Sequence, residues 1–288
     1  MAIKGVDISE NNPVVDFEKL KAAGVKFALI RCGYGNDDLS QDDSCFLENV
    51  RKAKAAGVPY GVYLYSYALT VAEARSETAH TLRLLKQIDR PAYGVWFDME
   101  DGDGYKARMG MPGNSTLVDI CDTYCRELQN AGYYVGIYAS LSWFNNKLND
   151  SCLDKYDKWV AQWNPTCDYK KPYGIWQYTD KFMVGGYPFD ANWAYKDYPA
   201  ITGPRKEEPE LTEAQVKKLV QDDYGRLNPT YNTVADVPSY WRADIEKLMD
   251  LGVIAGVGNG KLGLTRSEVK SAVVALRLVE RFFERNED

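Results

Sequence analysis

Residues 55–63 read Ala55-Ala56-Gly57-Val58-Pro59-Tyr60-Gly61-Val62-Tyr63, a pattern typical of a helix end, a glycine stop and then a buried strand. The same order occurs at 22–30 and again at 130–138. Helices and strands that alternate at this spacing predict a parallel sheet with crossover helices.

Eight candidate strands follow from this pattern, near 3–8, 27–33, 60–67, 93–99, 133–139, 158–163, 173–178 and 187–191. Helices are expected near 16–23, 42–56, 71–88 and 115–131, with little room for helices between the later strands. The pattern favours an α/β fold, an irregular (β/α) TIM-like barrel with about eight strands and fewer helices. An open doubly wound sheet is the alternative, but the glycine-rich phosphate turn usual after its first strand is missing.

The composition suits a large domain plus a small one, with 288 residues and 45% apolar side chains. The net charge is −6, from 35 basic and 41 acidic residues, and there is no basic cluster. This balance argues against nucleic-acid binding. Aromatic residues are abundant, including 21 Tyr and 7 Trp.

The composition changes near 203–211, where Pro and charged residues without apolar periodicity indicate a linker. We therefore expect the barrel domain over 1–202 and a small helical domain over 212–288. In the helical domain, Thr212 is expected to cap a first helix, and a second spans about 239–251. A third spans about 265–285, with Thr265 and Glu268 forming a capping box.

No run of about 18 apolar residues is present, so no transmembrane helix or membrane insertion is expected. The chain enters strand-like sequence at Ile3 without a basic and apolar leader, so no signal peptide is expected. The expectation is synthesis in the cytoplasm and, if the protein acts outside, release by a separate pore or by lysis.

The six cysteines lack CxxC spacing, and His80, the one histidine, lies in an expected helix far from any cysteine pair. We expect free, buried thiols and no zinc site, and the alternative is a disulfide whose partners the sequence does not assign. His80 is expected at the surface or the core edge, and a His-based triad is not expected.

Tyr93-Gly94-Val95-Trp96-Phe97-Asp98-Met99-Glu100 reads as a buried strand that ends in two carboxyls. Side chains two apart on a strand point to one face, with Cα atoms about 6.6 Å apart. Such a pair supplies a general acid and a stabilising anion or base, as cleavage of a glycosidic bond requires. A solvent-facing acidic strand end is the alternative interpretation.

Two further acids, Asp7 and Asp190, fall at the first and last expected strands. The carboxyl ends of barrel strands meet on one face, so all four acids would gather there unless Asp7 and Asp190 serve as caps or turn residues. Crowded like charges raise the pKa of at least one carboxyl, which suits a glycosidase acid.

Aromatic residues fall at the same strand ends. Singly each is better explained by packing than by contact with a ligand, but together they fit an oligosaccharide groove. The candidates for substrate binding are Tyr34, Tyr63, Tyr65, Tyr67, Tyr138, Trp163, Trp176 and Tyr178.

Residues 1–200 resemble glycoside hydrolase family 25, the muramidases of bacteria and their phages. The resemblance rests on the segments 5–9, 27–35, 61–67, 96–100, 136–140, 176–179 and 189–192, in that order and spacing. It implies an irregular barrel that cuts the β-1,4 bond between N-acetylmuramic acid and N-acetylglucosamine in bacterial peptidoglycan.

The resemblance also implies roles: Glu100 as general acid, Asp98 as an orienting or stabilising anion, and Asp7 and Asp190 completing the acidic set. No metal or organic cofactor is implied. The attack is either by water with inversion or assisted by the substrate acetamido group. Direct attack by Asp98 is disfavoured. A covalent nucleophile stands about 5–5.5 Å from the acid, and two carboxyls two residues apart on one strand are placed too loosely for that spacing.

The tail, from Val234 to Val269, is similar to one S-layer-homology repeat, a module that commonly holds proteins on wall polysaccharide. A secondary wall polysaccharide is therefore an expected partner, and a dimerisation or packing module is the alternative. The oligomeric state is left open.

The leading hypothesis is a peptidoglycan hydrolase, a phage endolysin or bacterial autolysin. A chitinase-like N-acetylhexosaminidase also uses an Asp-x-Glu pair on a barrel strand, but it carries a longer acidic run before the pair. A non-catalytic sugar-binding barrel is the third possibility, although a lectin has no need for four crowded acids.

Overall fold

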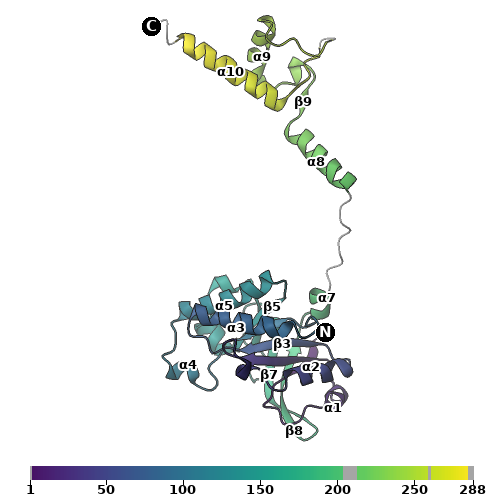
Figure 1. The fold of residues 1–288 in the computed structure, drawn as a ribbon, viewed down its shortest axis with the longest axis vertical. Helices are drawn as coiled ribbons and strands as arrows, with labels where there is room; N and C mark the ends of the chain where they lie inside the picture. Colours follow the sequence, from purple (N-terminus) through teal and green to yellow (C-terminus); the bar gives the residue numbers. More distant parts are fainter. Residues whose placement is uncertain (1, 204–212, 259–260, 285–288) are drawn as a thin grey trace. The chain divides into compact units, whose positions relative to one another are not determined.

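The computed structural model describes residues 2–203, 213–258 and 261–284. The chain divides into two compact units, Met1–Arg205 and Lys206–Asp288 (Figure 1). The expected linker at 203–211 lies, apart from Gly203, outside the described residues, and so does the expected cap Thr212. Among the described residues, no helix has the length and apolar character needed to cross a membrane.

The first unit is a closed eight-stranded barrel with the strands in sequence order. The strands are β1 (Ile3–Ile8), β2 (Phe27–Tyr34), β3 (Tyr60–Tyr65), β4 (Val95–Asp98), β5 (Val135–Ser140), β6 (Asp157–Ala161), β7 (Ile175–Val184) and β8 (Tyr187–Ala194). The irregular barrel expected from the sequence is confirmed, and the open doubly wound sheet is wrong.

One direction differs from the expected parallel sheet. β1 to β7 pair in parallel, but β8 runs antiparallel to both β7 and β1. β7 and β8 are joined by Gly185 and Gly186, whose φ angles are +61° and +89°. Two successive glycines with positive φ form the tight turn that hairpins favour, so this pair was the available sequence signal.

Helices pack around the barrel, and all but one of them lie before residue 147 in the sequence (Figure 1). They are α1 (Phe17–Ala22), α2 (Phe46–Ala55), α3 (Val71–Leu85), α4 (Tyr105–Arg108), α5 (Asn114–Asn130), α6 (Leu141–Asn146) and α7 (Tyr198–Thr202), with short 3-10 turns η1 (Leu39–Gln41) and η2 (Ser151–Leu153). The described stretch from 162 to 197 holds no helix, which confirms the helix-poor last third.

Large aromatic side chains fill the barrel interior. Trp96 and Trp159 are fully buried, with ring centroids 6.0 Å apart. Glycine on the neighbouring strand makes room for them, because a Cβ on Gly136 would lie 2.3 Å from the Trp96 ring. A second apolar layer packs between the barrel and the helices α2, α3 and α5.

All six cysteines are free. Cys32, Cys121 and Cys125 are buried, whereas Cys152 is exposed. The expectation of buried thiols therefore holds for part of the set.

The second unit contains α8 (Glu213–Leu227), α9 (Ser239–Asp250) and α10 (Arg266–Glu284), with the turn η3 (Val234–Asp236). A two-stranded ladder of β9 (Thr230–Tyr231) and β10 (Leu264–Thr265) was not expected from the sequence. The unit has its own apolar core, which includes Tyr231, Ile245 and Val269. The capping box before α10 is present, since the Thr265 backbone N–H donates to the Glu268 carboxylate at 2.7 Å.

Candidate active site

Four carboxyls line one cavity of about 250 Å3 at the end of the barrel where the parallel strands finish. Asp7 comes from β1, Asp98 from the last position of β4, Glu100 from just beyond it, and Asp190 from β8. The structure thus brings together all four acids predicted from the sequence.

The reason that Asp190 joins the group differs from the one expected. The expectation treated it as another carboxyl-terminal strand residue, but β8 is antiparallel, so its first half lies beside the last half of β1. Asp190 is directly paired with Asp7 in this register.

A single amide bridges these two carboxyls. Gln177 Nε2 donates to Asp7 Oδ2 at 3.1 Å and to Asp190 Oδ2 at 3.3 Å. Gln177 Oε1 accepts from the Tyr138 hydroxyl at 3.2 Å and from the Trp163 indole N–H at 3.0 Å. The amide nitrogen of Gln177 thus donates two hydrogen bonds and its oxygen accepts two, which fixes both carboxyls in place.

Asp7 has a second donor, because Asn192 Nδ2 donates to its Oδ2 at 2.7 Å. Asn192 Oδ1 accepts in turn from the indole N–H of Trp159 at 2.7 Å. Neither Gln177 nor Asn192 was selected from the sequence as a site residue. A polar amide at alternate positions of otherwise buried strands was the available signal.

Asp98 lacks such support. It is 4% exposed, and its Oδ1 is a buried atom without a hydrogen-bond partner among the described residues. Burial raises the pKa of Asp98 well above its ordinary range, and the nearby Glu100 raises it further. An unpartnered carboxylate oxygen is costly to bury, which favours a functional explanation.

The other three carboxyls also hold their protons to higher pH than usual, with burial as the largest cause. Burial raises the pKa of Asp7 to about 6, and the amide donors of Asn192 and Gln177 oppose this rise. The pKa of Glu100 rises to about 7, with the Lys106 ammonium opposing the rise. The pKa of Asp190 rises to about 8, where the negative charge of Asp7 adds to burial.

Five of the eight predicted aromatic residues line the site. Tyr63, Tyr65 and Tyr138 line the cavity with the acids. Tyr34 and Tyr67 line an adjoining hollow of about 450 Å3, which shares Asn11, Arg31, Tyr65 and Glu100 with the cavity. The two hollows together form one groove with tyrosines along it.

The remaining three aromatic residues line neither hollow. Trp163 is 60% exposed and reaches the site only through its bond to Gln177. The buried Trp176 donates its indole N–H to the Gln162 carbonyl at 2.8 Å. Tyr178 stacks on Trp193 with ring centroids 5.6 Å apart. Strand alternation turns Trp176 and Tyr178 away from Gln177, which lies between them.

Arg31 is a groove residue that sequence reasoning missed. It lines both hollows, and its side chain is only 11% exposed. Its guanidinium pairs with Glu10 and with Asp43, each at 2.9 Å. A lone cation inside the apolar strand at 27–34 was the signal.

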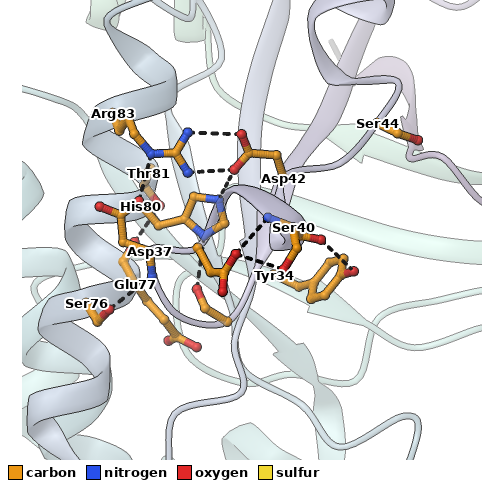
Figure 2. A network of polar contacts seen from close by, with 12 residues as sticks. Tyr34, Asp37, Ser40, Asp42, Ser44, Ser76, Glu77, His80, Thr81 and Arg83 are labelled. Carbon is orange, nitrogen blue, oxygen red and sulfur yellow. Dashed lines mark hydrogen bonds and ion pairs between the residues drawn. The ribbon is translucent and has the colours of Figure 1, made fainter.

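His80 was expected at the surface or core edge, but the structure buries it completely. Figure 2 shows its ring between the loop after β2 and helix α3. Nδ1 lies 3.1 Å from the Gly35 carbonyl and Nε2 lies 2.8 Å from Asp42. Arg83 donates to both oxygens of Asp42, at 2.9 and 2.6 Å. This network fastens the segment that follows Tyr34.

Within the described residues, no set of three or more His, Cys, Asp or Glu side chains is arranged to hold a metal ion.

Comparison with known proteins gives a consistent result. The family model for glycosyl hydrolases family 25 matches residues 6–187, which include Asp7, Asp98 and Glu100 and end before Asp190. "Probable GH family 25 lysozyme 2" of Dictyostelium discoideum is 27% identical over 67% of this chain and 91% of that protein. "Lysozyme M1" of Streptomyces globisporus is 26% identical over 66% of each chain.

A solved structure with a peptidoglycan ligand is also similar. The modular autolysin LytC of Streptococcus pneumoniae, solved in complex with synthetic peptidoglycan, is 28% identical with a TM-score of 0.61. The match covers 67% of this chain and 47% of the autolysin, so this chain spans about half the length of that protein.

Proposed function

Since this chain belongs to glycosyl hydrolases family 25, we propose that it is a peptidoglycan hydrolase that cuts the β-1,4 bond after N-acetylmuramic acid. The observation that carries the proposal is the set of four crowded carboxyls in a tyrosine-lined groove. A groove of this kind suits an extended glycan, because aromatic faces pack on sugar rings and hydroxyls bond to sugar hydroxyls.

Glu100 is the general acid of this proposal. It is the partly exposed member of the Asp98 and Glu100 pair, and both hollows reach it. Its pKa, raised to about 7, leaves it protonated in mildly acidic and neutral solution. It can then give its proton to the leaving oxygen of the glycosidic bond.

Asp98 acts in this proposal as the anion that orients the sugar and stabilises positive charge at its anomeric carbon. Its position at the end of β4, two residues before Glu100, supports orientation over covalent attack, for which the carboxyls stand about 5–5.5 Å apart. Asp7 and Asp190, held by Gln177, complete the negative surface under the sugar.

The second unit is proposed to hold the enzyme on the wall, through a secondary wall polysaccharide. Its own apolar core supports a separate module. The setting of the activity is the bacterial wall, as a phage endolysin or a bacterial autolysin.

The test is mass spectrometry of purified peptidoglycan after digestion and borohydride reduction. We expect muramitol ends with the unchanged protein and none above background with Glu100→Gln, which is nearly isosteric but cannot donate the acid proton. Glu18→Gln is the matched control, because Glu18 is 74% exposed on α1.

Each other outcome contradicts a part of the proposal. Reduced glucosamine ends would assign the chitinase-like glucosaminidase specificity. No new ends with any variant would leave a glycan-binding barrel. Normal cleavage by Glu100→Gln would remove Glu100 from the role of acid.

A further inference from the structure

The proposed reaction uses four carboxyls, and among the buried charged side chains that it does not use, Lys106 lies close to Glu100. Lys106 lies in α4, in the segment that follows Glu100, and is only 1% exposed. Lysine is almost never buried to this extent unless its charge is needed, since burial of an ammonium is costly.

The ammonium of Lys106 returns to the chain that bears the acid. Nζ donates to the Glu100 carbonyl at 2.8 Å and also to the Ser66 carbonyl just beyond β3. The ends of β3 and β4 are thereby joined at the point where Glu100 leaves the barrel.

The segment between Glu100 and Lys106 is folded to allow this return. Both oxygens of Asp101 accept backbone N–H bonds from the start of α4, at 2.7 Å from Lys106 and 3.0 Å from Ala107. Gly104, with φ of +72°, supplies the left-handed residue before the helix. The chain from 100 to 107 is therefore closed on itself around the ammonium.

The charges around this ammonium are mainly acidic. The acidic groups are Glu77 of α3, Asp98 of β4, Glu100 and Asp101 of the loop that follows, and the Cys121 thiol of α5. The Tyr65 ring of β3 also faces the ammonium, with its centroid 5.8 Å away. Glu100 itself also faces Asp7, Asp103 and Asp190.

We infer that Lys106 is a positioning residue for the proposed hydrolysis: its buried ammonium fixes the Glu100 backbone and keeps a positive charge beneath the carboxyl cluster. The inference rests on the proposed function of Glu100. Lys106 lines neither hollow, so it acts through Glu100 and Asp98 and not by contact with the glycan.

The sign of its effect follows from the charge. The ammonium opposes the rise in the pKa of both Glu100 and Asp98. Without it, both carboxyls would hold their protons to higher pH. Without the two bonds, the Glu100 carbonyl would also be free to shift.

Three substitutions separate charge from hydrogen bonding. Lys106→Met removes both, Lys106→Gln keeps N–H donors without charge, and Lys106→Arg keeps the charge. Lys26→Met is the matched control, because Lys26 is exposed at the opposite end of the barrel, just before β2.

The readouts are the pH profile of kcat and KM on peptidoglycan and a 13C titration of the Glu100 carboxyl. In Lys106→Met and Lys106→Gln we expect the alkaline limb and the Glu100 titration to move up by about one pH unit. We expect kcat to fall about tenfold or more with little change in KM. Lys106→Arg and Lys26→Met should stay near the unchanged enzyme.

Folded Lys106→Met and Lys106→Gln variants with an unchanged pH profile and Glu100 titration would overturn the inference and leave Lys106 a structural cross-link. If Lys106→Met does not fold, Lys106→Gln decides. If the unchanged protein releases no reducing ends, the proposed function fails, while the carboxyl titration still tests the link from Lys106 to Glu100.

Discussion

Asp7, Glu100 and Asp190 have folded-state pKa values raised from about 4 to about 6, 7 and 8, mainly by burial. A raised carboxyl pKa favours the folded chain most below the unfolded value, and this stabilisation is lost as the pH rises through the folded value. The site therefore costs the barrel stability in the neutral range where the other carboxyls of the protein are ionised. Since like charges oppose one another, the four carboxyls titrate as a group.

The pH dependence of the proposed reaction follows from the raised pKa of Glu100. We expect kcat/KM to fall as the pH rises through about 7, because Glu100 has a pKa of about 7 and must be protonated to act. The ionisation of Asp190 raises the pKa of Glu100, so Asp190→Asn removes this coupling and should move the limb to lower pH. The measurement is the pH profile of reducing-end release. Asp119→Asn, at an exposed position on α5, should leave the limb in place.

An Asp190→Asn limb at the position of the unchanged enzyme would mean that a group other than Glu100 sets it. A limb that moves equally in Asp119→Asn would point to the net charge of the protein instead of the local contact.

Helix α3 links the outer layer of the barrel to the groove. It begins with a capping box, since Thr70 accepts from the Glu73 N–H at 3.2 Å and Glu73 accepts from the Thr70 N–H at 3.0 Å. One turn further, Glu77 accepts from the Ser66 hydroxyl and the Tyr67 N–H, at 2.8 and 2.6 Å. The helix thus holds the chain after β3 as well as the loop after β2.

His80 on α3 holds the loop after β2 through the Gly35 carbonyl and Asp42. In His80→Leu, the carbonyl of Gly35 loses its partner, while Asp42 keeps Arg83. We expect the free energy of unfolding to fall by about 2 kcal/mol, the usual cost of a buried acceptor left unpaired. Urea unfolding followed by near-UV circular dichroism measures it.

Ala79→Leu, at an exposed position next to His80 on the same helix, is the control and should change stability little. Equal losses in the two variants would assign the effect to the helix and not to the network in Figure 2.

The whole molecule consists of two units, each with an apolar core of its own. The groove is built from barrel residues, from Asp7 on β1 to Asp190 on β8. Folding and chemistry of the barrel are therefore expected to be independent of the second unit, whose proposed contribution is attachment.

Removal of residues 206–288 should weaken binding to intact walls by about a hundredfold, as loss of a second linked binding site does. Cleavage of soluble glycan fragments should be nearly unchanged. Sedimentation with purified sacculi and kcat/KM on soluble fragments measure the two effects. Equal loss on both substrates would make the tail structural, and a change from dimer to monomer would favour the dimerisation alternative.

The sequence by itself determined the number and order of the barrel strands. Glycine stops followed by apolar runs, as at Gly57 and Tyr60–Tyr63, are local signals, and they placed the first six strands close to their observed bounds. β7 and β8 extend six and three residues beyond their expected ends, 178 and 191. Local geometry likewise put Asp98 and Glu100 on one side of the same strand end, because the side-chain period of a strand is two.

The tertiary structure alone decided how the rest of the site is made. The pairing of Asp7 with Asp190 depends on the register between β1 and the reversed β8, and the bridge from Gln177 joins the β7–β8 hairpin to β1, 170 residues away in the sequence. The burial of Lys106 likewise depends on Ser66. Such contacts are set by strand register across the closed barrel, where a slip of one residue turns every side chain to the opposite face, and that register is a long-range property.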